Sequence, residues 1–147
     1  MKKIILLSLI IALIIGSCSQ QEVKSPIEGA WQMISGIYIT PDTVINYPES
    51  TNGKHIKLVG KTYFTTIWQD TTIDKSNMLY GGFNGGTYTF ANGVYTETET
   101  HFSLLSNIGS KPSFNIVFNG DTAVFTAVLP PDTPSGYSNV EKWKRIE

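Results

Sequence analysis

The chain has 147 residues, a formal net charge of −1 and 41% hydrophobic residues, which is enough for one domain with a single hydrophobic core. Its eleven basic and twelve acidic side chains form no basic stripe, which argues against nucleic acid as a partner. Cys18 is the only cysteine, so the chain has no internal disulfide.

The first predicted element is an export signal. Lys2 and Lys3 precede an apolar run of twelve residues, and small residues then lead to Cys18. This order of basic, apolar and small residues is typical of a signal peptide. Twelve residues of helix span about 18 Å, which is too short for the ~30 Å hydrocarbon core of a bilayer. We therefore predict a lipoprotein signal peptide over residues 1–17 instead of a transmembrane helix.

The sequence Ile15-Gly16-Ser17-Cys18 resembles the lipobox of bacterial lipoproteins. The resemblance implies a diacylglycerol thioether on Cys18, cleavage before it, and an acyl chain such as palmitate on the new amino terminus. Two or three acyl chains anchor a protein stably, so we expect a lipid-anchored protein of the bacterial cell envelope. Ser19 stands where an Asp would resemble an inner-membrane retention signal, which favours the outer membrane. Residues 18–26 are predicted to be a short lipidated tether.

The rest of the chain has no helical periodicity. It contains eight runs rich in β-branched and aromatic residues, at residues 30–39, 55–59, 63–69, 86–90, 94–102, 114–118, 122–128 and 139–146. Asn92-Gly93, between the fourth and fifth runs, is the strongest short-range signal for a two-residue hairpin. This hairpin places Tyr88, Phe90 and Tyr95 on one face of a two-stranded ribbon.

The connections between these runs alternate between tight and long. Tight turns are expected at Gly60-Lys61, Asn92-Gly93 and Asn119-Gly120-Asp121, and long loops at residues 40–54, 70–85, 103–113 and 129–138. In an up-and-down meander, alternate connections lie at the same end of the sheet, whereas a Greek-key sandwich gives no reason for this alternation. We therefore predict that residues 27–147 form an all-β, eight-stranded antiparallel up-and-down barrel, which has room for one small ligand.

Two motifs at the ends of this domain resemble a known family. Gly29-Ala30-Trp31 opens the first strand, and residues 141–145 (Glu-Lys-Trp-Lys-Arg) form the last. Together they resemble the lipocalin and wider calycin pattern, and residues 85–88 and 95–97 extend the resemblance to a lipocalin-like family of exported bacterial lipoproteins. The resemblance implies that Arg145 lies across the indole of Trp31 and closes the tight-turn end of the barrel. It implies no particular ligand.

One strand carries the most polar candidates. Tyr95, Glu97, Glu99 and His101 alternate along it, and they point into the barrel if the face of Tyr95 is interior. A bulge between Tyr95 and Glu99 would exchange the two faces, and the glutamates would then form a solvated outer face. Alternate strand residues lie about 6.8 Å apart, which suits the paired carboxylates of inverting glycoside hydrolysis. Every Glu-x-Glu strand has this spacing, however, so no enzymatic activity is predicted.

We expect the barrel to bind a small apolar or amphipathic ligand near its long loops. Glu97 and His101 would be polar anchors, and the apolar walls would be Trp68, Tyr88, Tyr95, Phe114, Phe118 and Phe125. Such a combination of apolar walls and few polar groups is usual for ligand pockets. The alternative is an interaction or envelope-accessory module whose barrel is filled by its own side chains and whose loops contact protein or glycan.

Two further expectations concern the loops and the polar residues. Apolar residues in the first two long loops would either plug the barrel mouth or gate it; they are Val44, Ile45, Tyr47, Met78, Leu79, Tyr80 and Phe83. His55, His101 and the glutamates lack the spacing of metal ligands, so neither a metal nor a cofactor is predicted. Oligomeric state and protein partners cannot be derived from these patterns.

Overall fold

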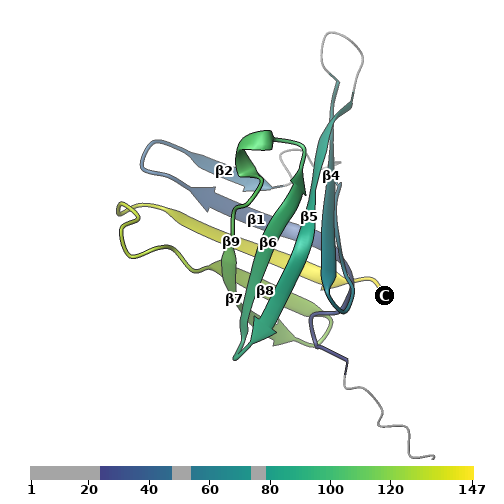
Figure 1. The fold of residues 1–147 in the computed structure, drawn as a ribbon. Helices are drawn as coiled ribbons and strands as arrows, with labels where there is room; N and C mark the ends of the chain where they lie inside the picture. The colour runs from purple at the N-terminus through teal and green to yellow at the C-terminus, as the bar shows by residue number, and fades with distance from the viewer. Residues whose placement is uncertain (1–23, 48–53, 74–78) are drawn as a thin grey trace, which may run out of the picture.

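The computed structural model describes residues 24–47, 54–73 and 79–147. The predicted signal peptide, Cys18 and Ser19 therefore lie outside the described residues. The strands are β1 (Gly29–Ile39), β2 (Val44–Tyr47), β3 (Lys54–Val59), β4 (Tyr63–Ile73), β5 (Leu79–Ala91), β6 (Val94–Phe102), β7 (Ser113–Asn119), β8 (Thr122–Ala127) and β9 (Ser138–Arg145), with a 3-10 helix, η1 (Leu105–Asn107), after β6 (Figure 1). Within these ranges no helix is long and apolar enough to cross a bilayer.

The sheet closes on itself. From β3 to β9, each strand pairs antiparallel with the next in the chain, and β1 pairs with both β3 and β9. The predicted all-β, eight-stranded antiparallel up-and-down barrel is confirmed. The barrel is complete between Gly29 and Arg145, because the register of the closing pair runs from Trp31 opposite Arg145 to Ile39 opposite Ser138.

The two ends of the barrel differ as the loop lengths predict. The β5–β6 hairpin pairs Ala91 with Val94, and its turn residues Asn92 and Gly93 both have positive φ, as a two-residue hairpin turn requires. This turn, the turns between β3 and β4 and between β7 and β8, the start of β1 and the end of β9 all lie at one end. The long connections lie at the other end. We call the two halves of the interior the closed half and the open half.

Two of the predicted long loops contain additional strand. In the first, β2 pairs with residues 36–39 of β1, beside the half of β1 that β3 does not reach. It is preceded by a turn in which the Thr40 N–H donates to the Thr43 carbonyl and the Thr43 N–H donates to the Thr40 hydroxyl. Val44 on this strand is exposed, so it does not plug the mouth, and Ile45 is half-buried.

The predicted long loop at 70–85 is mostly strand. β4 and β5 extend through most of it and form a long ribbon that projects beyond the neighbouring strands (Figure 1). Gly81 and Gly82, which fall in this predicted loop, lie within β5 and form no turn. Gly82 is the cross-strand partner of Trp68, and a side chain there would collide with the indole. Glycine in a strand often marks such a close approach. Phe83 points outward and is exposed, so it does not fill the mouth. Met78 and the side chains of Tyr47, Leu79 and Tyr80 lie outside the described part.

A cluster of buried apolar side chains fills the closed half up to its boundary with the open half. Trp31, Tyr95, Phe125 and Trp143 are each at most 1% exposed, and the remaining buried members are Ile27, Met33, Val59, Phe64, Phe114, Ile116 and Ala123. Tyr88 and Phe90 pack against this cluster, so the predicted aromatic face of the hairpin is interior. The face of β7 and β8 that carries Phe114 and Phe125 is interior as well.

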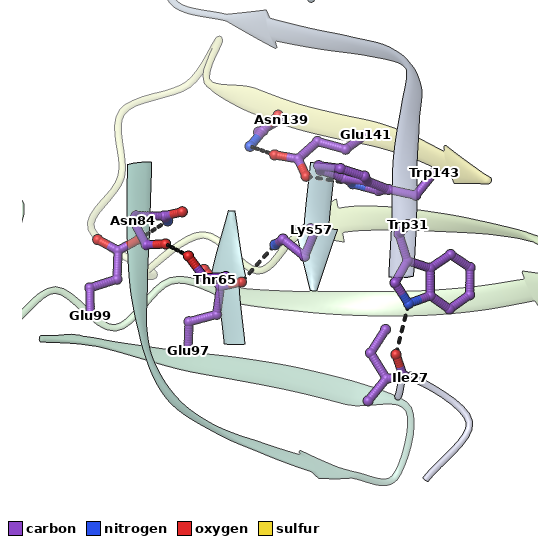
Figure 2. Close-up of polar contacts among 10 residues, drawn as sticks. All are labelled: Ile27, Trp31, Lys57, Thr65, Asn84, Glu97, Glu99, Asn139, Glu141 and Trp143. Carbon is purple, nitrogen blue, oxygen red and sulfur yellow. Dashed lines mark hydrogen bonds and ion pairs between the residues drawn. The ribbon is translucent and has the colours of Figure 1, made fainter. Parts of the chain in front are cut away.

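Arg145 covers the floor of the closed half. Its guanidinium carbon lies 4.1 Å from the centroid of the Trp31 ring, and its nitrogens donate to the carbonyls of Glu28 at 2.5 Å and Pro26 at 2.6 Å. The Trp31 indole donates to the carbonyl of Ile27 at 2.8 Å (Figure 2). Gly29 has a φ of +140°, and a Cβ at this position would collide with the guanidinium. The glycine of the Gly-x-Trp motif is therefore required both by its backbone angle and by Arg145.

Candidate functional site

The inward-facing side chains change from apolar to polar between the two ends of the barrel. On β6, buried Tyr95 is followed toward the long loops by Glu97 and Glu99, which are 2% and 4% exposed. On β9, buried Trp143 gives way to Glu141, which is half-buried. Similar changes occur at Thr66 on β4, Asn84 on β5 and Asn139 on β9. The open half is therefore lined by carboxylates, amides and a hydroxyl.

A buried ion pair marks the boundary between the two halves. The Lys57 ammonium on β3 lies 2.6 Å from Glu97 Oε1 (Figure 2), and both side chains are almost completely buried. The ammonium also lies 5.3–5.9 Å from the centroids of five rings, those of Phe64, Tyr95, Phe114, Phe125 and Trp143. Aromatic faces attract cations, so this cation is held by one carboxylate and a shell of aromatic rings.

The buried groups around this pair have shifted pKa values. Burial raises the pKa of Glu97 and exceeds the opposing effect of the Lys57 charge, while the charge of Glu141 raises it further. Burial also raises the pKa of Tyr95, and the charges of Glu97 and Glu141 add to that rise. The Tyr95 hydroxyl is therefore protonated at all physiological pH values and lies within the field of both carboxylates.

Two further carboxylates are each held by an asparagine side chain. Asn84 Nδ2 donates to Glu99 Oε1 at 2.7 Å, and Asn139 Nδ2 donates to Glu141 Oε1 at 3.2 Å (Figure 2). The second oxygen of Glu99 accepts from the Ser110 hydroxyl at 2.6 Å, which ties the loop after β6 to the barrel wall. The second oxygen of Glu141 accepts from the Trp143 indole at 2.9 Å. Within the part of the chain that the structure describes, neutral donors thus hold both carboxylates, and no cation is paired with either.

The same region contains buried polar atoms that have no hydrogen-bond partner. Among the described residues they are Thr66 Oγ1, Asn84 Oδ1, Tyr95 OH and Asn139 Oδ1. Thr66 pairs with Lys57 on one side and with Asn84 on the other in the strand register, so these polar groups adjoin the ion pair. An unsatisfied buried group costs about 1–3 kcal/mol. Such a concentration is unusual in a native interior and suggests that a further partner belongs there.

The residues predicted to bind a ligand lie at three different depths in the barrel: at the boundary, in the closed half and in the open half. Tyr95, Phe114 and Phe125 surround the Lys57 ammonium, and Glu97 is its partner. Phe118 contacts Trp31 in the closed half. Tyr88 also belongs there, because its hydroxyl donates to the Gly60 carbonyl at 2.6 Å. Trp68 is half-buried in the open half, with its ring 5.9 Å from that of Phe102.

His101 is placed differently from the prediction that it points inward. Gly86 pairs with Glu99 and Gly85 with His101, so Thr100 is the extra residue of a bulge. A bulge interrupts the alternation of a strand, and His101 is exposed, with its ring nitrogen 2.9 Å from Thr100 Oγ1. The bulge follows Glu99 and does not precede it, which is why both glutamates remain inside while His101 does not.

The sequence analysis did not identify several polar residues of the open half, although strand alternation could have identified two of them. Lys57 lies two residues from Val59 on β3, and Glu141 lies two residues from Trp143 on β9. Strand alternation places both charged groups on the face of a core residue. Thr66, Asn84 and Asn139 could not be singled out in this way, because such residues are common on outer faces as well.

Within the described ranges, no group of three or more His, Cys, Asp or Glu side chains is arranged to hold a metal ion. Comparison of the chain with protein-family models, with curated proteins and with solved structures finds no match.

Proposed function

We propose that the chain is a lipocalin-like lipoprotein, anchored in the bacterial cell envelope through Cys18, that binds a small amphipathic ligand in the open half of its barrel. The observation that carries the proposal is the divided interior. Apolar side chains fill the closed half, whereas the open half holds buried polar atoms that lack partners. A ligand with a polar group would satisfy those atoms, and its apolar part would lie against Trp68 at the rim.

The position of the anchor supports an orientation for this site. β1 begins at the closed end, only a short distance after Cys18 in the sequence. The tether of residues 18–26 reaches at most roughly 30 Å when fully extended. The barrel would therefore stand with its closed end toward the bilayer and its open half away from it. Cys18→Ala is expected to move the chain from the membrane fraction to the soluble fraction, and membrane retention of this variant would refute the anchor.

Native mass spectrometry of a chain running from Ser19 to Glu147 tests the binding function. This segment contains the complete barrel, and omission of Cys18 makes it soluble. A discrete added mass that is lost on denaturation, acquired either in the bacterium or from offered amphiphiles, is the expected result. A mass that stays ligand-free after incubation with fatty amines, alcohols, acids and sterols would refute the function.

A second candidate function follows from the outer surface of the same barrel. Leu58, Ile67 and Phe83 point outward from three neighbouring strands and are 45–52% exposed, and Ile67 pairs directly with Phe83. Exposed apolar patches often mark interaction sites. This patch favours the alternative of an interaction module in the envelope, which gains weight if the mass spectrum shows no ligand.

A further inference from the structure

The donors and acceptors of the open half identify the chemistry of its ligand. Resting on the binding function proposed above, we infer that this ligand is an amphipathic organic cation, with a primary ammonium or a similar head group that donates several hydrogen bonds and accepts none. The ammonium would lie among Glu99, Glu141 and the free oxygens of Asn84 and Asn139. The argument comes from two features of the site that favour a cation and a third that is compatible with one.

The first feature is a surplus of acceptors. Each asparagine turns its NH₂ group toward a carboxylate oxygen, which can only accept. The orientation of both amides is therefore fixed, and their oxygens are left buried without a donor. Carboxylate oxygens each have two lone pairs, and each oxygen of Glu99 and Glu141 receives one neutral donor from the described residues. What these groups lack is hydrogen-bond donors.

The second feature is the balance of charge. Among the described side chains, the carboxylates that face the interior are Glu97, Glu99 and Glu141, and the only ammonium there is that of Lys57. The His55 imidazole lies on the same face of β3, opposite Trp68, and already has an interaction of its own. Lys57 is 2.6 Å from Glu97 and is enclosed by aromatic rings. Among the described residues, neither Glu99 nor Glu141 forms an ion pair with a cation. An anionic ligand would meet their repulsion, whereas a cationic ligand would supply the missing charge.

The third feature is a pair of buried hydroxyls near these groups. Thr66 and Tyr95 are more than nine-tenths buried, and neither hydroxyl has a partner within hydrogen-bond geometry. The Tyr95 hydroxyl nevertheless lies close enough to Glu97 for hydrogen bonding to affect the pKa of both groups. The Tyr95 hydroxyl is close enough to Glu97 and Glu141 for their charges to act on it. Thr66 lies between Lys57 and Asn84 in the sheet. Both hydroxyls can accept a hydrogen bond from an ammonium, but a hydroxyl also donates. They are therefore compatible with a cation, and the choice of charge rests on the asparagine oxygens and the carboxylates.

The chain itself shows that this interior can hold an ammonium. Lys57 is a buried alkylammonium between a carboxylate and aromatic rings, directly beside the site. The ligand would repeat this arrangement one level nearer to the long loops. Glu99 and Glu141 would pair with its head group, and the rings of Trp68 and Phe102 would provide apolar contacts for its tail.

The test compares three probes that share one tail and differ only in the head group: octylamine, octanol and octanoate. Each is titrated into the Ser19–Glu147 chain below its micelle concentration and followed by calorimetry. We expect octylamine to bind at least 10-fold more tightly than octanol, and octanoate to bind least. If octanol or octanoate binds as tightly as octylamine, the cation preference is refuted while the binding function stands. If none of the three binds, both proposals fail for this class of ligand.

Two variants then locate the site. Glu141→Gln keeps the shape of the side chain but removes its charge, and it should weaken octylamine at least 10-fold while leaving octanol within about 2-fold. Asp121→Asn is the matched control, because Asp121 is an exposed carboxylate at the closed end that pairs loosely with Lys144. It should change neither affinity. Equal losses in both variants, or none in Glu141→Gln, would contradict the proposed site.

Discussion

The same strands line both halves of the barrel interior, but the two halves differ in the polarity of their side chains and in how far the buried polar atoms are hydrogen-bonded. In the closed half, Trp31 is packed by rings and covered by Arg145, and the polar atoms of both side chains have partners. In the open half and at its boundary, a polar side-chain atom of Thr66, of Tyr95 and of each of the two asparagines is buried without a partner. The difference suggests that the closed half stabilises the fold, whereas the open half keeps unpartnered polar atoms that lower stability but can bind a ligand.

The unpartnered polar atoms lower the stability of the folded chain. Four unpartnered buried atoms at about 1–3 kcal/mol each would take a large share of the 5–15 kcal/mol that stabilises a typical domain. Ordered water can satisfy such atoms, and so can a ligand. The two halves should therefore respond differently to substitution: changes in the closed half should lower stability alone, and changes in the open half should trade stability against binding.

The largest effect is expected at the boundary between the halves. Lys57→Met leaves the Glu97 carboxylate buried without its cation, and we expect a loss of about 3–5 kcal/mol in the free energy of unfolding. Replacing both partners, in Lys57→Met with Glu97→Leu, should recover most of that loss, because a well-packed apolar pair avoids the desolvation of two charges. Denaturant titrations measure both quantities, and a double variant no better than the single one would contradict this account of the pair.

The next largest effect is expected in the closed half. Arg145→Met removes the cation over Trp31, which contributes about 0.5–2 kcal/mol, together with two charge-assisted hydrogen bonds to backbone carbonyls. We expect a loss of about 2–3 kcal/mol and unchanged affinity for octylamine. Lys142→Met, at an exposed position on the same strand, is the control and should change the stability little. A large change in ligand affinity for Arg145→Met would show that the halves are not separate.

A smaller effect of opposite sign is expected in the open half. Thr66→Val keeps the shape of the side chain and removes an unpartnered hydroxyl, so it should stabilise the chain by about 1 kcal/mol and weaken octylamine binding. Thr65→Val is the control on the neighbouring position, where the hydroxyl donates to the Asn84 carbonyl at 3.0 Å, and it should destabilise the chain by about 0.5–1.5 kcal/mol. The reverse order of stability would refute the division of the interior.

The smallest expected effect is a pH dependence. Because the pKa of Glu97 is raised in the folded chain, the folded state binds more protons than the unfolded state above the ordinary Glu value of about 4.3. The free energy of unfolding should therefore fall as the pH rises from this value through the raised pKa. Glu97→Gln should lose this fall. Urea titrations of both chains between pH 4 and pH 7 measure it, and identical slopes would contradict the shift.

Much of the barrel was predictable, because its signals are local. The hairpin at Asn92-Gly93 is set by two residues with positive φ, and the alternation of loop lengths follows from the order of turns along the chain. The extent of β4 and β5 was not predictable, because Gly81 and Gly82 are usual in turns. Their role in the strand depends on the indole of Trp68 across the ribbon, which is a tertiary contact.

The candidate site was predictable only in part. Glu97 and Glu99 were recognised as interior if the face of Tyr95 is interior, and the structure places them there. His101 was wrongly expected among the inward-facing residues. The extra residue Thr100 reverses the alternation of the strand, and no sequence signal marks this bulge. The link between Lys57 and Glu97 joins residues 40 positions apart, so it emerges only when the sheet closes.

The three tryptophans allow the central claim to be tested in one measurement. Trp31 lies in the closed half, Trp143 at the boundary with its indole on Glu141, and Trp68 in the open half. Their indole N–H resonances, followed by NMR during an octylamine titration, report each level separately. We predict saturable shifts for Trp68 and Trp143 and an unchanged Trp31. A response that is largest at Trp31, or absent from all three at saturating octylamine, would contradict a ligand site in the open half.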